Sequence, residues 1–180
     1  MSQKPASIGV ALFDVDGTLI EGHAWASVVE YAQTSRRHRL WLYTAHLPKF
    51  LMLRLHLMTQ VGFRDSWVRG LARLLQGWTT LRIDALFAWI ADDYLAARYR
   101  PDVIAILQEH KAQGDHVILI STMFRGALQQ VAARLGADAG LGTELEISDG
   151  VCTGRILGET CVGAQKVDLA RAYLANRASG

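Results

Sequence analysis

Cysteine is scarce in this sequence, and its two cysteines form no metal-binding pattern. Cys152 and Cys161 are the only cysteines among 180 residues, and neither belongs to a CxxC pair or to a Cys/His ligand spacing. The zinc-binding motifs that depend on such spacings are therefore excluded. We expect the two thiols to be reduced rather than joined in a disulfide.

An excess of charge of one sign is also lacking. The 19 lysines and arginines nearly balance the 17 aspartates and glutamates, and the basic residues are scattered along the chain. Binding to a nucleic-acid backbone needs a clustered basic surface. We therefore expect no nucleic-acid partner.

A long hydrophobic run is absent as well. Segment 40–61 has a membrane-like composition, but Pro48, Lys49 and Arg54 interrupt it, and a membrane span needs roughly 20 apolar residues in succession. Residues 1–9 contain no apolar run of the kind that a secretory signal requires. We expect a cytoplasmic protein without membrane contact, although docking of these apolar helices on a membrane surface is an alternative.

The sequence does contain two short apolar runs that end in polar residues. Ile8–Phe13 ends at Asp14, and Val117–Ile120 ends at Ser121. Such runs are typical of strands buried on both faces of a parallel sheet. A helical pattern that opens at Pro101 precedes the second run, as in a crossover connection. We therefore predict an α/β fold with a Rossmann-like parallel sheet.

Residues 21–100 show helical periodicity and no strand signal. Their apolar residues recur at three- and four-residue spacing, and breaks fall near Pro48, Gly62 and Gly77. We predict about four helices in this segment. Beyond it, the pattern predicts helices over 125–135 and 165–176 and a hairpin between them with an Asp-Gly turn.

Asp14 and Asp16 stand two residues apart at the end of the first predicted strand. Alternation along an extended chain points both carboxylates the same way. One can then act as a nucleophile or metal ligand and the other as an acid and base. Gly17 lets backbone N–H groups approach an anion. The alternative is that the two aspartates only cap a loop.

Two more candidates follow later in the chain. Ser121 and Thr122 come directly after the second strand, and Lys166 stands near the start of the last helix. Read alone, the serine is a helix cap and the lysine a solvated surface residue. Their order after the two aspartates favours a phosphate site.

These motifs carry a family resemblance. FDVDGTL (13–19), VILIST (117–122) and GAQK (163–166) resemble the first three motifs of the haloacid dehalogenase superfamily, and residues 142–166 resemble its phosphoserine-phosphatase-like branch. The resemblance implies a core of residues 1–20 and 101–180 with an inserted helical cap of residues 21–100. It also implies a small phosphate monoester as the substrate.

The resemblance assigns a role to each candidate. Asp14 is the nucleophile that forms an aspartyl-phosphate, and Asp16 is the acid and base. Mg²⁺ is held by Asp14 and by the backbone oxygen of Asp16. The phosphate is bound by the following residues: Gly17, Ser121, Thr122 and Lys166. Dehalogenation at carbon is an alternative, which the second carboxylate disfavours.

The sequence departs from the family pattern after Lys166. The fourth, acidic motif is not found before Gly180. We therefore expect weakened metal binding, and an unpaired, apolar edge on the strand 8–13. The leading interpretation is a magnesium-dependent phosphatase impaired in this way. The alternative is a non-catalytic phosphate-binding or regulatory fragment.

Two features bear on the substrate. His23 stands where phosphoserine phosphatases carry an acid, with Glu21 nearby, and Thr122-Met123 replaces a Gly-Gly pair. We therefore predict that phosphoserine is not the substrate. Apolar cap residues either line a pocket for an apolar ester or, as we prefer, form the core of the cap. These residues are Trp41, Leu42, Phe50, Leu51, Met52 and Leu55.

Overall fold

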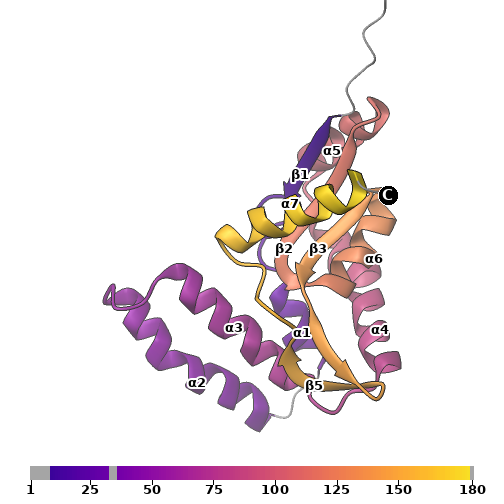
Figure 1. The fold of residues 1–180 in the computed structure, drawn as a ribbon. Helices are drawn as coiled ribbons and strands as arrows, with labels where there is room; N and C mark the ends of the chain where they lie inside the picture. The colour runs from indigo at the N-terminus through magenta and orange to yellow at the C-terminus, as the bar shows by residue number, and fades with distance from the viewer. Residues whose placement is uncertain (1–8, 33–35, 179–180) are drawn as a thin grey trace, which may run out of the picture.

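The computed structural model describes residues 9–32 and 36–178. Its core is a parallel sheet in the order β1-β2-β3 (Figure 1). The strands are β1 (Val10–Asp14), β2 (His116–Phe124) and β3 (Ala139–Thr143). Asp14 pairs with Ile120, so the carboxyl ends of β1 and β2 meet at one edge of the sheet. The predicted α/β fold class with a parallel sheet is confirmed.

Helices cover both faces of this sheet. Helices α5 (Pro101–Ala112) and α6 (Arg125–Leu135) pack on one face, and α7 (Ala164–Ala178) packs against β2 and β3 on the other. Strand alternation divides β2 between the two layers. Val117 and Leu119 belong to the larger apolar core, whereas Ile118 and Ile120 belong to the cluster under α7.

Strand β1 is only half covered. β2 is buried on both faces as predicted, but Val10 and Leu12 of β1 are 45% and 50% exposed, so the prediction was wrong for this strand. The reason is that α7 contacts β2 and β3 and leaves this face of β1 open. Within the described residues, β1 pairs with β2 alone. Ile8 lies outside the described residues.

Strand β3 was not predicted, because its sequence AGLGT has no apolar run. Its glycines are required by close contacts with α6 and with β2. A Cβ at Gly140 would lie 2.4 Å from the backbone of Leu128, and one at Gly142 would lie 2.3 Å from the carbonyl oxygen of Met123. Close approach, not chain flexibility, explains glycine at both positions.

The predicted hairpin consists of β4 (Leu145–Ser148) and β5 (Val151–Ile156). Asp149 and Gly150 have φ values of 51° and 74°, and two positive φ angles in a two-residue turn define type I′. The hairpin joins the preceding helical segment, because the N–H of Gly77 donates to the carbonyl of Cys152 at 2.9 Å.

Residues 21–100 are helical, as predicted. Outside residues 33–35, which are not described, they contain four α-helices, a π-helical turn η1 (Ile90–Tyr94) and a 3₁₀ turn η2 (Ala96–Arg98). The α-helices are α1 (Trp25–Tyr31), α2 (Arg36–Arg54), α3 (Gln60–Leu74) and α4 (Thr80–Trp89).

Two of the three predicted breaks are found within a few residues. Gly77 forms one, with a φ of 80°. The break predicted near Gly62 falls at residues 55–59, directly before α3, where His56 has a φ of 58°. The break predicted near Pro48 is wrong, because Pro48 lies inside α2 at an exposed position.

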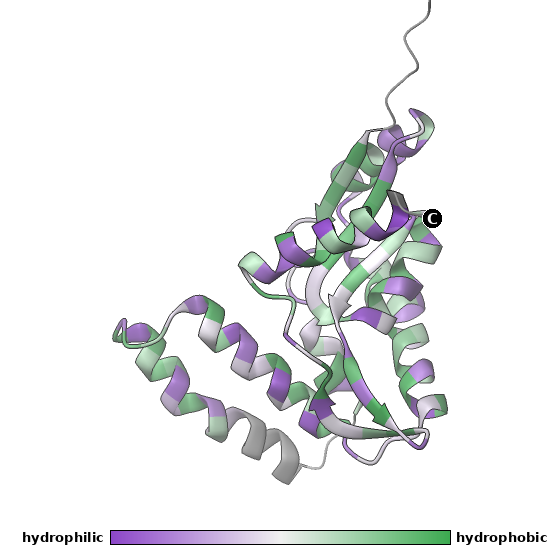
Figure 2. Ribbon diagram, in the orientation of Figure 1, coloured by the Kyte–Doolittle hydropathy of each residue, from purple (hydrophilic) through white to green (hydrophobic). Residues whose placement is uncertain are grey.

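The pair α2–α3 projects from the core, whereas α4 runs alongside α6 (Figure 1). Figure 2 shows hydrophobic colour along β1 and β2, and alternating colour along the projecting pair. Arg134 of α6 forms a bidentate ion pair with Asp92 of η1. No helix in the described ranges is long and apolar enough to cross a membrane.

Candidate active site

Asp14 and Lys166 form an ion pair at the carboxyl end of β1. Lys166 Nζ, from the first turn of α7, lies 2.7 Å from Asp14 Oδ1, which also accepts the N–H of Val15 at 2.9 Å. The side chain of Lys166 is only 21% exposed, so it is not a free surface lysine. A cation fixed on a carboxylate at this edge can also neutralise a bound phosphate.

Asp16 is tied to the core and to the start of α1. Its Oδ2 accepts from Ser121 Oγ at 2.9 Å, and its Oδ1 accepts from the N–H of Ala24 at 2.6 Å. Ser121 is fully buried, and its Oγ accepts the N–H of Met123 at 3.2 Å. The serine hydroxyl thus donates to Asp16. Ser121 would have to break this hydrogen bond before it could donate to a phosphate.

The turn after Asp14 brings the two aspartates together. The N–H groups of Thr18, Leu19 and Ile20 converge on the carbonyl of Val15 at 3.0–3.3 Å. Gly17 has a φ of 74° and is exposed, so its conformation explains the glycine. Gly17 is not among the residues that line the adjoining cavity.

A cavity of about 430 Å³ opens between this edge of the sheet and the helices α1, α2 and α3. Its size is within the usual range for ligand sites. One end is polar and includes Asp14, Asp16, Thr122 and Lys166. The predicted candidates are therefore brought together, except that Ser121 contributes through Asp16 and Gly17 lies outside the cavity.

The rest of the cavity wall is largely aromatic and aliphatic. Trp25 and Trp67 contact edge to face with ring centroids 4.8 Å apart, and Phe63 stacks on Trp67 at 6.3 Å. His23 lines the cavity and stacks on Trp25, whereas Glu21 does not line it. The other lining residues are Phe50, Leu53, Gln60, Arg64, Val68, Leu71, Met123 and Phe124.

Sequence reasoning missed the face of α3 in this wall. Gln60, Phe63, Arg64 and Trp67 stand three or four residues apart, which places them on one side of the helix. The periodicity was visible in the sequence. It marks a face but does not say whether that face meets a protein core or a cavity.

The apolar residues of α2 that were named from the sequence differ in what they contact. Phe50 lines the cavity, whereas Leu51, Met52 and Leu55 are 40–58% exposed and line neither the cavity nor a core. The preferred interpretation as a cap core is therefore wrong for these four. The main contact of the described part of α2 is with α3, and these apolar residues point into solvent. The side chains of Trp41 and Leu42 lie outside the described residues.

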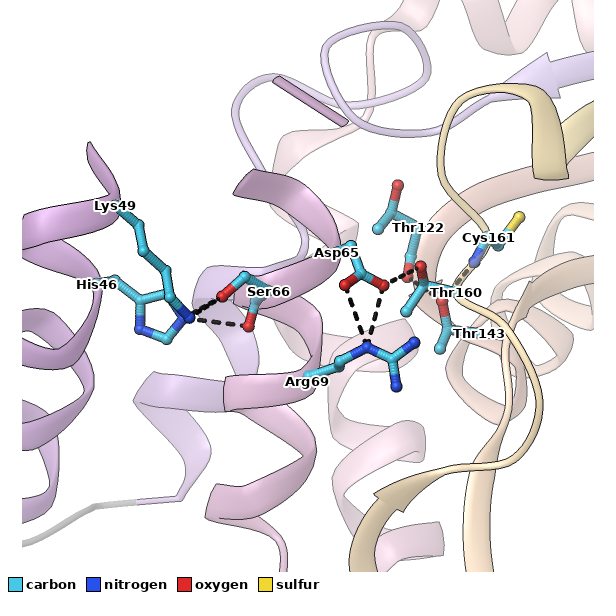
Figure 3. Close-up of polar contacts among 9 residues, drawn as sticks. All are labelled: His46, Lys49, Asp65, Ser66, Arg69, Thr122, Thr143, Thr160 and Cys161. Atoms are coloured by element: carbon cyan, nitrogen blue, oxygen red, sulfur yellow. Dashed lines mark hydrogen bonds and ion pairs between the residues drawn. The ribbon is translucent and has the colours of Figure 1, made fainter. Parts of the chain in front are cut away.

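A polar relay joins α3 to the core beside the cavity (Figure 3). Thr160 Oγ1 donates to Asp65 Oδ1 at 2.6 Å, and the next residue, Cys161, donates its N–H to Thr143 Oγ1 at 3.0 Å. Thr143 in turn donates to the carbonyl of Thr122 at 2.8 Å. This relay connects the projecting helices to the strand end that carries the phosphate-site candidates.

Asp65 is ionised more readily than a free aspartate. Partial burial raises its pKa, but hydrogen bonds from Thr160 and Arg69 outweigh this effect and lower the pKa overall. Arg69 Nε lies 3.1 Å from both carboxylate oxygens. The carboxylate therefore remains charged, and an acceptor only, at neutral pH.

Cys161 lies near the site but is not a nucleophile. Burial raises the pKa of its thiol to about 11, although the nearby Lys166 opposes the shift. Burial likewise raises the pKa of Cys152. Both cysteines are free and buried, which confirms the prediction that no disulfide joins them.

The residues fit Mg²⁺ by the chemistry of their donors. Asp14 and Asp16 offer oxygen ligands, and Mg²⁺ is often held by one or two carboxylates together with substrate phosphate and water. No group of three or more His, Cys, Asp or Glu side chains that could hold a metal ion occurs in the part of the chain described.

Comparisons with known proteins agree with this geometry. Residues 11–180 match the family of haloacid dehalogenase-like hydrolases. The chain belongs to this family. Its relatives place it in the phosphoserine-phosphatase-like branch, as the motifs indicated.

Two relatives illustrate the match. A phosphoserine phosphatase of Mycobacterium tuberculosis is 27% identical over 173 residues, which are 94% of this chain and 55% of that protein. A phosphoserine phosphatase of Albidiferax ferrireducens is 31% identical over 108 residues, or 58% of this chain and 43% of that protein. The chain thus spans little more than half the length of its Mycobacterium relative.

Solved structures share the fold of this chain. A Bordetella pertussis protein of unknown function aligns with a TM-score of 0.74 at 22% identity, over 96% of this chain and 76% of that one. A phosphoserine phosphatase with an analogue of its phospho-aspartyl intermediate aligns with a TM-score of 0.61 at 17% identity, over 96% and 73%.

Proposed function

We propose that this chain carries the catalytic site of a magnesium-dependent hydrolase of small phosphate monoesters, with Asp14 as the nucleophile. The observation that supports this most directly is the 2.7 Å contact between Lys166 Nζ and Asp14 Oδ1, beside Asp16 and at the mouth of a ligand-sized cavity. Family membership supports the same reaction class.

The first half-reaction transfers phosphate to the protein. A carboxylate oxygen of Asp14 attacks the phosphorus and forms an O–P bond, while the bond from phosphorus to the ester oxygen breaks. Asp16 donates a proton to the leaving alkoxide. Lys166 neutralises charge on the phosphoryl oxygens throughout.

The second half-reaction restores the protein. The Asp16 carboxylate takes a proton from water, whose oxygen attacks the same phosphorus, and the bond between phosphorus and Asp14 breaks. Inorganic phosphate leaves. Mg²⁺, held by the Asp14 carboxylate and the Asp16 backbone oxygen, would supply additional neutralisation of the phosphoryl charge.

Ser121 acts in this scheme through Asp16. Its buried hydroxyl holds one carboxylate oxygen while the N–H of Ala24 holds the other. These two hydrogen bonds fix the orientation of the Asp16 side chain before the substrate binds. Thr122 lies at the cavity wall, where its side chain can contact the phosphate.

The test is phosphate release from 4-nitrophenyl phosphate with Mg²⁺ or with EDTA. Asp14→Asn should lower the rate on the order of 1,000-fold or more, because no nucleophilic carboxylate remains. Asp168→Asn, at an exposed position of the same helix as Lys166, is the matched control and should stay near the wild-type rate.

A chain that binds vanadate but hydrolyses nothing would contradict the enzyme proposal. That result would favour the alternative, a non-catalytic phosphate-binding or regulatory fragment. Equal rates for the wild type and Asp14→Asn would exclude Asp14 as the nucleophile.

A further inference from the structure

The buried part of the cavity wall is apolar, and this bears on what is esterified to the phosphate. Val68 and Leu71 of α3 are 4% and 1% exposed, and Met123 and Phe124 of β2 are 4% and 1% exposed. All four line the cavity. Water released from such a surface favours an apolar ligand group.

The polar residues of the wall do not alter this conclusion. His23, Gln60 and Arg64 line the cavity, but all three are exposed and so lie toward its solvent side. Among the described lining residues, the only carboxylates are Asp14 and Asp16. Both belong to the phosphate end, so no acid remains to pair with an ammonium group on the substrate.

We propose that the substrate is a phosphate monoester of an apolar alcohol, whose hydrocarbon group packs against α3 and the aromatic residues Trp25, Phe63 and Trp67. This inference rests on the proposed function for the position of the phosphate. It agrees with the cavity lining, in which His23 is present and Glu21 is not, and it predicts that phosphoserine is not the preferred substrate.

The matched ligands are propyl phosphate and 2-aminoethyl phosphate. They have the same number of heavy atoms, but the first ends in a methyl group and the second in an ammonium group. Binding to the non-hydrolysing Asp14→Asn variant can be measured by calorimetry. Propyl phosphate should bind at least tenfold more tightly. Along the series methyl, ethyl, propyl and butyl phosphate, affinity should rise about fourfold for each methylene.

Phe50 and Leu51 supply matched variants on neighbouring positions of α2. Both side chains are exposed, by 52% and 57%, but only Phe50 lines the cavity. Phe50→Ala should weaken butyl phosphate binding about fivefold or more without unfolding the chain. Leu51→Ala should leave it within about twofold, because its side chain points away from the ligand.

Such an ester could be free in solution or part of a lipid. Phosphate release from hexyl phosphate, compared with release from phosphatidylcholine vesicles that contain phosphatidic acid, distinguishes the two sources. Release from either one in preference to 2-aminoethyl phosphate supports the proposal.

The two proposals fail in different ways. Flat affinity along the alkyl series, or tighter binding of 2-aminoethyl phosphate, would overturn the apolar substrate even if 4-nitrophenyl phosphate is hydrolysed through Asp14. A steep alkyl series without hydrolysis of any ester would support the apolar pocket and overturn the proposed enzyme.

Discussion

Thr160 donates a hydrogen bond to Asp65 at 2.6 Å, which fastens the projecting helix α3 to the loop between β5 and α7. This loop also carries Cys161, whose N–H donates a hydrogen bond to Thr143 Oγ1 of β3, the strand beside β2. The position of α3, and therefore of one cavity wall, is coupled to the loop that leads to Lys166.

Replacing Thr160 by valine tests this coupling. Thr160→Val keeps the shape of the side chain but removes the donor, while Asp65 retains Arg69. We expect a loss of about 1 kcal/mol in the free energy of unfolding, measured in urea. Hydrogen exchange should accelerate in α2 and α3 more than in the sheet, because the link opens locally.

Thr153→Val is the matched control for this prediction. Thr153 Oγ1 also bonds a carboxylate, that of Glu146, but within the hairpin β4–β5. The control should lower stability without a selective effect on α2 and α3. Equal exchange in the two variants would show that Thr160 does not couple the helices to the core.

The sequence predicted the chemical site better than its walls. The pairing of Lys166 with Asp14 could be predicted from the resemblance of residues 13–19 and 163–166 to the family motifs, because a lone lysine at a helix start carries no such signal. The contact of Ser121 with Asp16 could not, because it depends on the turn that follows β1. The face of Phe63 and Trp67 was not identified from the sequence, because only the packing of α2 and α3 turns it into a cavity wall.

Strand β3 and the path of α2 were missed for other physical reasons. Gly140 and Gly142 break up any apolar run in the sequence, yet both are needed, because a side chain at Gly140 would meet the backbone of α6 and one at Gly142 the carbonyl oxygen of Met123 in β2. Pro48 indicates a helix break in the sequence, yet α2 continues through it, although a proline there cannot donate the backbone hydrogen bond to the carbonyl four residues earlier.

His116 should make stability depend on pH near neutrality. Burial lowers the pKa of His116 below 6.5, and Arg177 and Lys111 add to this effect, whereas Asp138 opposes it. The imidazole lies 3.2 Å from the hydroxyl of Tyr173 and stacks on its ring.

The sign of the effect follows from linkage. A lowered pKa in the folded state means that the unfolded chain binds the proton first as the pH falls. The contribution of His116 is therefore fully present above pH 6.5 and is lost as the pH falls toward the folded pKa. Urea unfolding at pH 7.5 and 5.5 should show a smaller change for His116→Gln than for the wild type. The assignment would be contradicted if the wild type were more stable at pH 5.5 than at pH 7.5 and His116→Gln abolished this difference.

The two cysteines should react slowly in the folded protein. Burial raises the pKa values of Cys152 and Cys161, to about 11 for the latter, so little thiolate exists at pH 8. Iodoacetamide should label neither at a rate comparable to that of a small thiol until urea unfolds the chain. Rapid labelling of native Cys161 at pH 8 would show that the loop 157–163 opens readily.

The open face and edge of β1 should promote self-association of this 180-residue chain. Val10 and Leu12 are about half exposed, and β1 pairs only with β2 among the described residues. An exposed apolar strand of this kind is a site for pairing with a second chain, and a lysine in it opposes such pairing. Leu12→Lys should therefore lower the average mass seen by light scattering at high protein concentration.

Leu81→Lys, at an 80% exposed position of α4, adds the same charge away from the sheet and should not reproduce the effect. An equal decrease in mass for both variants would assign the change to net charge, and a wild type that remains monomeric at all concentrations would show that the exposed strand does not drive association.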